Sequence, residues 1–309
     1  MKLLTKSMQE TISRQMSNKA RDIDVCLIYA LDGSMPKEYL LDCLMFYQNR
    51  DGGFGNALHI DNYNKDSSVY QVYEAFRLLD MLGFDSKCEL ELYTTIVNKA
   101  GNYLFNRVPP INNRWNPNVL TNNTYPHAID FTFGDEANIK FGMHPTMAIV
   151  GYSLEFYNET KAYYKKAYKM AVELIKEFSN KDSLTKYEYI SVNSFINSLT
   201  KCNLFKDEVI KMKSHLIELA KEDVSLDFDD LDAIHPLDCS LYVSDEELDQ
   251  KKNLELDYII DNIKPHGLWD HLNSWGYDTY AEEDSAKLKW IGAETVNNYY
   301  LLKLFGRIE

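Results

Sequence analysis

The feature that most constrains this chain is the octapeptide at residues 48–55, Gln-Asn-Arg-Asp-Gly-Gly-Phe-Gly. It lies between two segments, 39–47 and 69–82, whose apolar residues recur at helical spacing. Glycines adopt backbone conformations that other residues resist, and Gln or Asp side chains can hydrogen-bond the unpaired backbone groups at helix ends. An aromatic ring can fill the apolar space between neighbouring helices. The pattern therefore predicts a structural connection between helices, with no catalytic role, formed by Gln48, Asp51, Gly52, Gly53 and Phe54.

A weaker copy of this pattern occurs at residues 264–269, Lys-Pro-His-Gly-Leu-Trp. It also follows a helical pattern, at 254–263, and precedes another, at 289–304. The copy lacks the Gln and the Asp-Gly pair, but Gly267 and Trp269 preserve the combination of a glycine and an aromatic residue. Two such connections between helices favour a repetitive helical architecture.

The motif Gln-x-x-Asp-Gly-Gly-Phe-Gly resembles the repeat of terpenoid cyclases and protein prenyltransferases. In those proteins the Gln and the aromatic residue hold adjacent helices of a double-ring helical barrel, the (α/α)6 toroid. The chain also resembles a group of uncharacterised bacterial proteins with prenyltransferase-like repeats. The matching segments are 48–56 with Asp61 and Ser67-Ser68, 125–128, 144–146, 235–238, and 288–292 with Thr295 and Gly306-Arg307. The resemblance implies an all-α chain that forms one toroid domain over residues 1–309.

Length and composition agree with a helical chain. A length of 309 residues suits about twelve helices of ~11–12 residues each, and the 13 Gly and 8 Pro cluster in a few loops. Helices are expected at 3–16, 20–31, 36–47, 69–82, 90–105, 145–157, 161–178, 184–199, 206–221, 245–263 and 287–305. Three long loops are expected at 106–142, 222–239 and 264–285. We expect a site where such loops converge over a central cavity.

The charge and the ends of the chain limit its partners. The net charge is −14 and no basic stripe is visible, so nucleic acid is not an expected partner. No apolar run approaches the ~20 residues of a membrane span, and the first residues lack the apolar core of a secretion signal. We therefore expect a cytoplasmic protein without a membrane span.

One candidate for chemistry is Asp227-Phe228-Asp229-Asp230. It resembles the Asp-x-Asp-Asp pattern of cyclases that protonate an alkene or an epoxide, with Asp229 as the acid. Burial and neighbouring carboxylates raise the pKa of a carboxyl group, which is the condition for such an acid. The alternative is a solvated loop, because residues 222–232 are acidic throughout.

Metal-dependent prenyl transfer is a second candidate. Zinc would require Asp-x-Cys and a later His, whereas this chain has Asp238 and Cys239 adjacent, followed by His266 and His271. No Asp-Asp-x-x-Asp run for magnesium diphosphate lies on an expected helix. The five cysteines show neither disulfide nor zinc spacing. We assign no metal ligand and no cofactor from the sequence, and both zinc and magnesium stay open.

A third group of residues, which rests on positions that the resemblance implies, combines histidines, carboxylates and indoles near loop ends. A His beside a carboxylate and an indole wall can perform acid–base chemistry or hold a polar ligand. The predicted catalytic residues are His144, Asp229 and Asp238. The predicted substrate-binding residues are His59, Asp61, His127, Trp275, Trp290 and Glu294. Each also has a structural alternative: a helix cap, a bond to loop backbone, or a place in the core.

These observations lead to three functional hypotheses. The resemblance, together with 22 Tyr, 14 Phe and 4 Trp whose rings can stabilise a cation, implies an apolar, isoprenoid-like ligand in the cavity and acid-initiated cyclisation. The first alternative is a non-catalytic toroid that binds a peptide or protein at its loop-rich end. The second is an acid–base enzyme on a polar metabolite or glycan, which paired carboxylates across the cavity would favour.

Overall fold

The computed structural model describes residues 1–135, 140–270, 274–276 and 280–309. Within these residues the regular structure is helical, and β structure is limited to isolated bridges, so the all-α prediction is confirmed. The elements are α1 (Lys6–Lys19), α2 (Asp22–Asp32), α3 (Tyr39–Met45), α4 (Val69–Met81), α5 (Glu91–Asn102), η1 (Tyr103–Arg107), η2 (Leu120–Thr124), η3 (Ile129–Phe131), α7 (Thr146–Phe156), α8 (Ala162–Phe178), α9 (Lys186–Lys201), α10 (Lys206–Asp223), α11 (Pro236–Ser240), α12 (Glu246–Asp261) and α13 (Glu282–Leu304).

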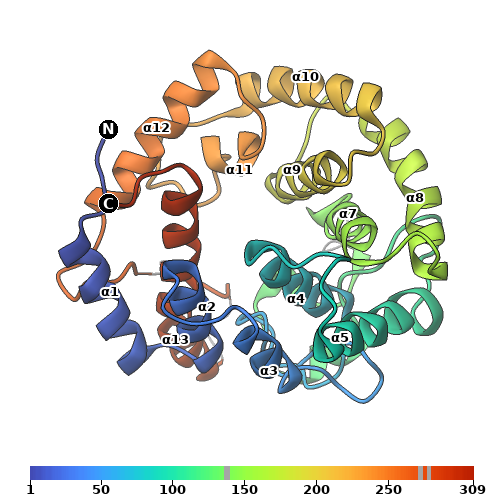
Figure 1. Cartoon of the computed structure of the whole chain (residues 1–309), viewed down its shortest axis with the longest axis horizontal. Helices are drawn as coiled ribbons and strands as arrows, with labels where there is room; N and C mark the ends of the chain where they lie inside the picture. Colours follow the sequence, from blue (N-terminus) through green and yellow to red (C-terminus); the bar gives the residue numbers. More distant parts are fainter. Residues whose placement is uncertain (136–139, 271–273, 277–279) are drawn as a thin grey trace.

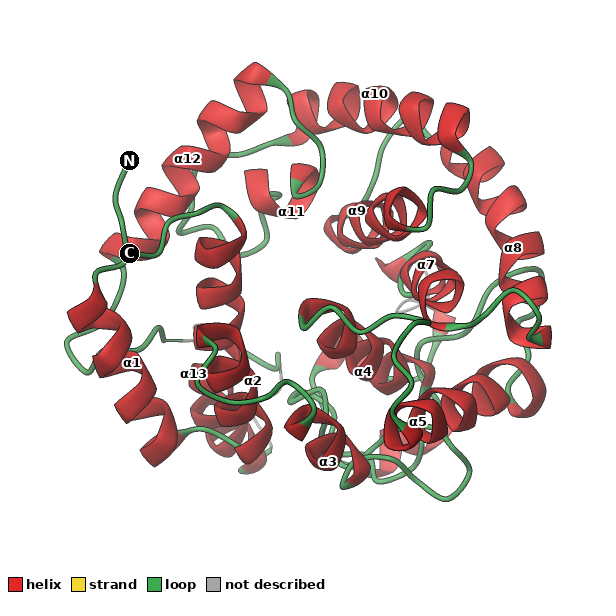
Figure 2. Ribbon diagram, viewed as in Figure 1, coloured by secondary structure: helices red, strands yellow, loops and turns green. Residues whose placement is uncertain are grey.

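The helices alternate between the perimeter and the interior of the molecule. In Figure 1, α1, α3, α5, α8, α10 and α12 lie around the outside, and α2, α4, α7, α9, α11 and α13 lie closer to the centre. Figure 2 shows that loops connect these helices throughout the described chain. The interior helices contact one another in the pairs α4–α7, α7–α9 and α9–α11, and α2 contacts α13. The first and last interior helices are therefore neighbours.

Local sequence explains where helices begin and how deeply they lie. The Ser68 hydroxyl accepts the Gln71 N–H at 3.3 Å and caps α4. Thr185 and Glu188 form a capping box at the start of α9. Every residue of α7 is buried, whereas α8 buries only one face. An apolar helix such as α7 requires neighbours on all sides, which explains its interior position.

The two ends of the chain are joined. The Leu4 N–H donates to the carbonyl of Arg307 at 2.7 Å, and the Glu309 N–H donates to the carbonyl of Leu4 at 3.1 Å. The Arg307 side chain is buried, and its guanidinium donates to Asp257 of α12 and to the Asn253 side chain, both at 2.7 Å. These contacts tie the first residues and the last residues to α12.

The octapeptide connects α3 to α5 and to the loop before α4. The Gln48 side chain donates to the carbonyl of Gly52 at 3.0 Å and to that of Ile96, in α5, at 2.9 Å. The Asp51 carboxylate accepts from the Gly53 N–H at 3.0 Å and from the Ser67 hydroxyl at 2.7 Å. Side chains at one turn therefore hold together three separate stretches of backbone.

The second copy of the motif repeats this backbone pattern. The N–H of Gly52 donates back three residues at 3.0 Å, and that of Gly267 does the same at 2.7 Å. Both glycines adopt positive φ, +96° and +87°. His266 Nδ1 accepts the Leu268 N–H at 3.3 Å, two residues on, as Asp51 does for Gly53. The two connections, α3 to α4 and α12 to α13, are thus a structural repeat.

Three expectations about loops require correction. The segment 222–239, expected as a loop, contains the start of α11, and α13 begins inside the segment 264–285. The long stretch 106–142 includes the short helices η2 and η3. Helices of three to five residues are too short to show an apolar period, so pattern analysis does not detect them.

Candidate functional site

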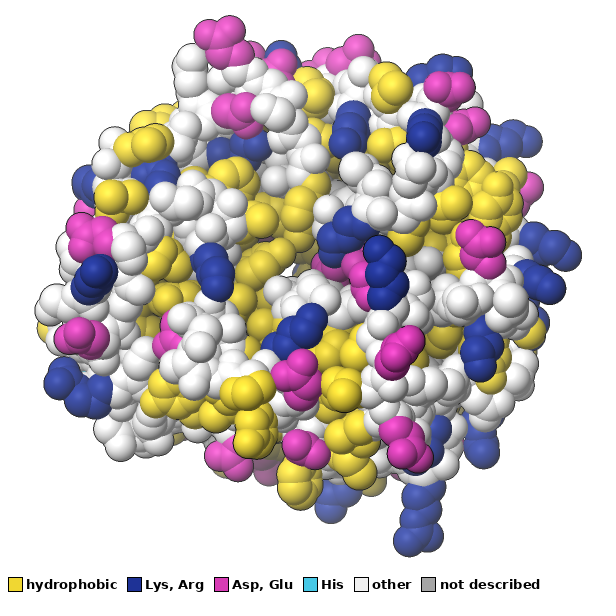
Figure 3. Space-filling view, viewed as in Figure 1, with side chains coloured by type: hydrophobic (Ala, Val, Ile, Leu, Met, Phe, Trp, Pro, Cys, Tyr) yellow, Lys and Arg dark blue, Asp and Glu magenta, His cyan; other side chains and the backbone are white. Residues whose placement is uncertain are grey.

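A cavity of about 540 Å³ lies among the interior helices. Its lining comes from α4, α7, α9, α11, α12 and α13 and from the loops that precede them. On the face shown in Figure 3 the molecule is hollowed near its centre, between apolar side chains and a mixture of basic and acidic ones. The size suits a small organic ligand.

The wall of the cavity combines aromatic rings with carboxyl groups. The rings belong to Tyr70, Tyr73, Tyr152, Phe228, Tyr242, Tyr258, Trp269, Trp290 and Tyr300. The carboxyl groups belong to Glu74, Asp80, Asp229, Asp238, Glu255, Asp270 and Glu294.

Two of these carboxylates have strong basic partners. Glu74 accepts from Nε and Nη2 of Arg77 at 2.9 and 2.7 Å, a bidentate pair within α4. Arg77 lowers the pKa of Glu74, against the opposing effect of burial. Asp80 forms an ion pair with Lys201, which also contacts Glu155 at 3.0 Å. These cationic partners fix both carboxylates in position.

Asp238 is held through one of its two oxygens. Oδ2 accepts the His235 N–H at 3.1 Å and lies 3.3 Å from the Lys186 ammonium group. Oδ1 has no hydrogen-bond partner among the residues that the structure describes. The Asp238 side chain is therefore fixed in position while one oxygen is available to a ligand.

Glu255 lies next to Asp238. Its Oε2 accepts the N–H of Leu237, the residue before Asp238, at 2.7 Å. Burial and then the charge of Asp238 raise the pKa of Glu255 to about 8. At neutral pH this carboxyl group is mostly protonated and can donate a proton.

Glu294 is the third carboxyl group near Asp238. Burial raises its pKa, the nearby charge of Asp238 adds to the effect, and a bond from Asn298 at 3.3 Å opposes it. Trp290 lies one turn earlier on α13 and also lines the cavity. The structure thus brings Asp238, Trp290 and Glu294 together at one cavity, with Glu255, which the sequence analysis did not identify.

Asp61 positions the indole of Trp290. Its Oδ1 accepts Nε1–H groups from Trp275 at 2.7 Å and from Trp290 at 2.6 Å. Neither Asp61 nor Trp275 is among the residues that line the cavity. Asp61 therefore acts on the site through Trp290.

His59 lines the cavity beside aromatic rings. Its ring centroid is 5.0 Å from that of Tyr70 and 5.5 Å from that of Trp290. Burial lowers its pKa, so the ring is neutral at pH 7. Nδ1 is buried and has no hydrogen-bond partner within the described part of the chain.

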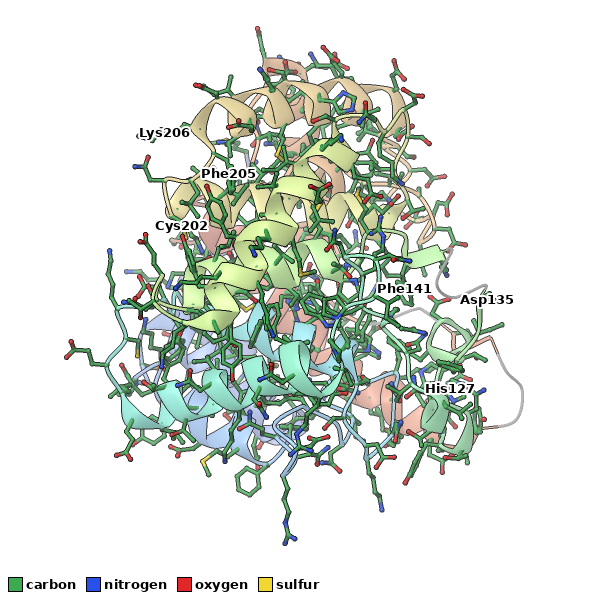
Figure 4. All side chains as sticks on the ribbon, turned by 90° about the vertical axis from the view of Figure 1, so that its right-hand side faces the viewer. His127, Asp135, Phe141, Cys202, Phe205 and Lys206 are labelled. Carbon is green, nitrogen blue, oxygen red and sulfur yellow. The ribbon has the colours of Figure 1, made fainter. Side chains whose placement is uncertain are left out.

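The other two predicted histidines lie outside the lining of the cavity. His144 is buried behind Tyr73, bonds Ser191 through Nδ1 at 2.8 Å, and has its pKa lowered to about 3 by burial. His127 contacts the Tyr125 carbonyl at 2.6 Å and the Thr132 hydroxyl at 3.1 Å. Figure 4 shows His127 at the end of the molecule opposite to Cys202 and Phe205. At His127 these contacts order a loop, whereas at His144 they leave Nε2 buried with no hydrogen-bond partner among the described residues.

Asp229 lies in an exposed turn at the edge of the cavity. Its Oδ1 accepts the Tyr258 hydroxyl at 2.6 Å, and its N–H donates to Asp227 at 3.4 Å. This environment lacks the apolar burial that an alkene-protonating Asp requires.

The zinc candidates that the structure describes, Asp238, Cys239 and His266, do not form a metal-binding cluster. Among the described residues, no group of three or more His, Cys, Asp or Glu could hold a metal ion. The buried Cys239 thiol donates to the Pro236 carbonyl at 3.6 Å, and burial raises its pKa to about 12. His266 bonds Asp270 at 3.0 Å, and His271 lies outside the described residues.

The residues that sequence reasoning missed are Glu74, Arg77, Lys186 and Glu255. The sequence does contain an indication of Glu74 and Arg77, because they are charged residues three positions apart in a helix that is otherwise mostly apolar. Lys186 is the first residue of α9, and Glu255 lies in a helix rich in charged residues; at both positions a single charge is typical of a solvated face.

Comparisons of the chain with protein-family models, with curated proteins and with solved structures found no match. Within the described residues, none of the helices has the length and apolar character needed to cross a membrane. We therefore infer function from the geometry of the cavity.

Proposed function

We propose that the chain is an (α/α)6 toroid and an acid–base enzyme whose central cavity binds a hydroxylated small molecule, such as a sugar residue of a glycan. The toroid proposal is supported by the alternation of outer and interior helices, by the contact between α2 and α13, and by the repeated glycine turns. It keeps the fold that the resemblance to terpenoid cyclases and prenyltransferases implies.

The observation that carries the proposed chemistry is the pairing of Asp238 with Glu255. Asp238, beside Lys186, offers a free carboxylate oxygen, and Glu255, with its pKa raised to about 8, holds a proton at neutral pH. Two carboxyl groups in different protonation states are what glycosidic bond cleavage requires. Glu255 would protonate the leaving oxygen, and Asp238 would activate water or attack the sugar.

The charged lining favours a polar ligand over a hydrocarbon. An isoprenoid would remove water from Asp238, Lys186 and Arg77 without replacing the lost hydrogen bonds, which is costly. Hydroxyl groups would replace those bonds, and the aromatic rings offer flat apolar faces to the C–H side of a sugar. The same rings support an isoprenoid ligand as the second candidate.

The test compares the two ligand classes directly. Wild-type protein is incubated with defined oligosaccharides and, separately, with farnesyl and geranylgeranyl diphosphate, and the products are identified by mass spectrometry. We expect oligosaccharide cleavage that falls at least ~100-fold in Asp238→Asn and Glu255→Gln, with little change in Asp229→Asn. Conversion of an isoprenoid diphosphate that depends on Asp229 would instead support cyclase chemistry.

A further inference from the structure

We infer that the sugar residue bound in this cavity is uncharged and that Arg77, with Glu74 and Asn297, fixes its orientation. This inference rests on the acid–base function proposed above and adds the class of sugar and a binding subsite to it. The relevant groups lie on α4 and α13, which both line the cavity.

The Arg77 guanidinium is held rigidly but keeps donors available. Nε and Nη2 donate to Glu74, and Nη1 donates to the Asn297 side-chain oxygen at 3.1 Å. A guanidinium has five N–H groups, so one on Nη1 and one on Nη2 have no acceptor among the described residues. The Arg77 side chain is about a quarter exposed, and because it lines the cavity, this exposed part faces the space that a ligand would occupy.

This subsite is adjacent to the acid–base groups. Asn297 lies three residues after Glu294 on α13, which places both on one face of the helix, one turn apart. The positive charge of Arg77 acts on Glu294 and opposes the rise in the pKa of that carboxyl group. A ligand that contacts Arg77 would therefore extend directly toward the Glu294 and Asp238 side of the cavity.

The chemistry of the subsite matches hydroxyl groups. A hydroxyl both donates and accepts hydrogen bonds. Arg77 provides donors, and the Glu74 carboxylate and the Asn297 amide provide acceptors at the same place. Neighbouring hydroxyl groups of a sugar ring can use both kinds of partner at once.

The charge of the lining disfavours an acidic sugar. The described lining contains three basic side chains, Arg77, Lys186 and Lys264, and seven carboxyl groups, one of which, Glu255, is mostly protonated at neutral pH. Arg77 is already neutralised by Glu74, and Lys186 by Asp238. A carboxylate or phosphate on the ligand would thus meet net negative charge in the lining, and the charge of the cation at this subsite is already balanced.

The experiment measures binding by isothermal titration calorimetry. The probes are glucose, galactose and mannose, with glucuronate, galacturonate and glucose 6-phosphate as charged counterparts. At least one neutral sugar should bind about tenfold or more tightly than its charged counterparts. Arg77→Gln and Asn297→Ala should each weaken that binding about tenfold. Arg77→Gln removes the charged donor itself, and Asn297→Ala removes the acceptor that holds the guanidinium in position. Arg77→Lys should not restore it, because an ammonium lacks the planar fork.

Arg21→Gln is the matched control. Arg21 forms the same kind of bidentate pair with Asp24, three residues later, but it is not among the residues that line the cavity. This control should lose stability and keep sugar binding. Asn297→Ala leaves the Glu74–Arg77 pair intact, so it preserves the test if Arg77→Gln fails to fold.

Three outcomes would overturn the inference. Equal or tighter binding of the charged sugars would contradict the neutral class, and unchanged binding in both Arg77→Gln and Asn297→Ala would contradict the subsite. In either case the proposed acid–base function stands if Asp238→Asn still abolishes cleavage. Absence of binding by all six sugars, with no oligosaccharide cleaved, would remove both proposals together.

Discussion

At the scale of single residues, Glu255 couples the stability of the protein to pH. Its pKa in the folded protein is about 8, above the ordinary value of 4.5, because burial and Asp238 disfavour its charged form. The stability contributed by the protonated group is therefore fully present below about pH 4.5 and is lost as the pH rises through 8.

The corresponding prediction concerns Glu255→Gln, which cannot ionise. Between pH 5 and 9, the free energy of unfolding of the wild type should fall by about 4 kcal/mol relative to this variant, because each unit of pKa difference between the folded and unfolded states is worth about 1.36 kcal/mol. Urea denaturation at a series of pH values measures the difference. Parallel pH profiles for the two proteins would show that Glu255 is ionised in the folded state at neutral pH, and the acid role would then be lost.

At the scale of elements, the glycine turn between α3 and α4 determines how the chain changes direction. Gly52 has a φ of +96°, and a Cβ atom there would clash with the Lys99 carbonyl in α5. Gly33, after α2, has a similar φ of +82° but has open space around it. The two positions therefore separate the effect of backbone strain from that of steric contact.

Gly52→Ala should destabilise the protein by about 2–4 kcal/mol, because strain and a backbone clash act together. Gly33→Ala should cost only ~1 kcal/mol, from strain alone. Thermal unfolding of the two variants provides the comparison. Equal losses at both positions would mean that the close approach of the octapeptide to α5 does not contribute to stability.

The helices were predictable because each long segment has an apolar period that burial imposes. The octapeptide was recognisable as a connection because its glycines and polar side chains are local signals. The α11 helix was not, since its five residues follow an acidic stretch that is typical of a solvated loop. The sequence pattern at 264–269 is a weak signal because it lacks the Asp of the octapeptide. In the structure, His266 provides the contact that Asp51 makes in the octapeptide.

The candidate site was predictable only in part, because its groups come together through tertiary structure. Asp238, Trp290 and Glu294 were identified from the resemblance and do line the cavity. Glu255 lies on α12, and its importance arises from contact with the residue before Asp238. Nothing in the sequence around Glu255 indicates that contact, so only the folded arrangement reveals it.

At the scale of the whole molecule, Arg307 holds the ends of the chain together. It is buried and bonds Asp257, Asn253 and the Lys2 carbonyl. Arg307→Ala should destabilise the protein by about 3 kcal/mol, because it removes a fully buried side chain together with its charge-assisted hydrogen bonds. Hydrogen exchange should increase most in α1, α12 and the last turn of α13.

Arg14→Ala is the control for that prediction, because Arg14 is exposed on α1 and should change stability by no more than ~0.5 kcal/mol. Uniformly increased exchange across all helices in Arg307→Ala would contradict the idea that this residue acts on the junction of the chain ends. Exchange confined to that junction would support it.

If the cavity binds a hydroxylated ligand for acid–base chemistry, a variant without the Asp238 carboxylate should trap that ligand. The measurement is native mass spectrometry of Asp238→Asn protein after exposure to a mixture of oligosaccharides and isoprenoid diphosphates. We expect adducts that differ by whole sugar residues and that disappear in the Arg77→Gln, Asp238→Asn double variant. An isoprenoid adduct, or no adduct with any member of the mixture, would contradict that expectation.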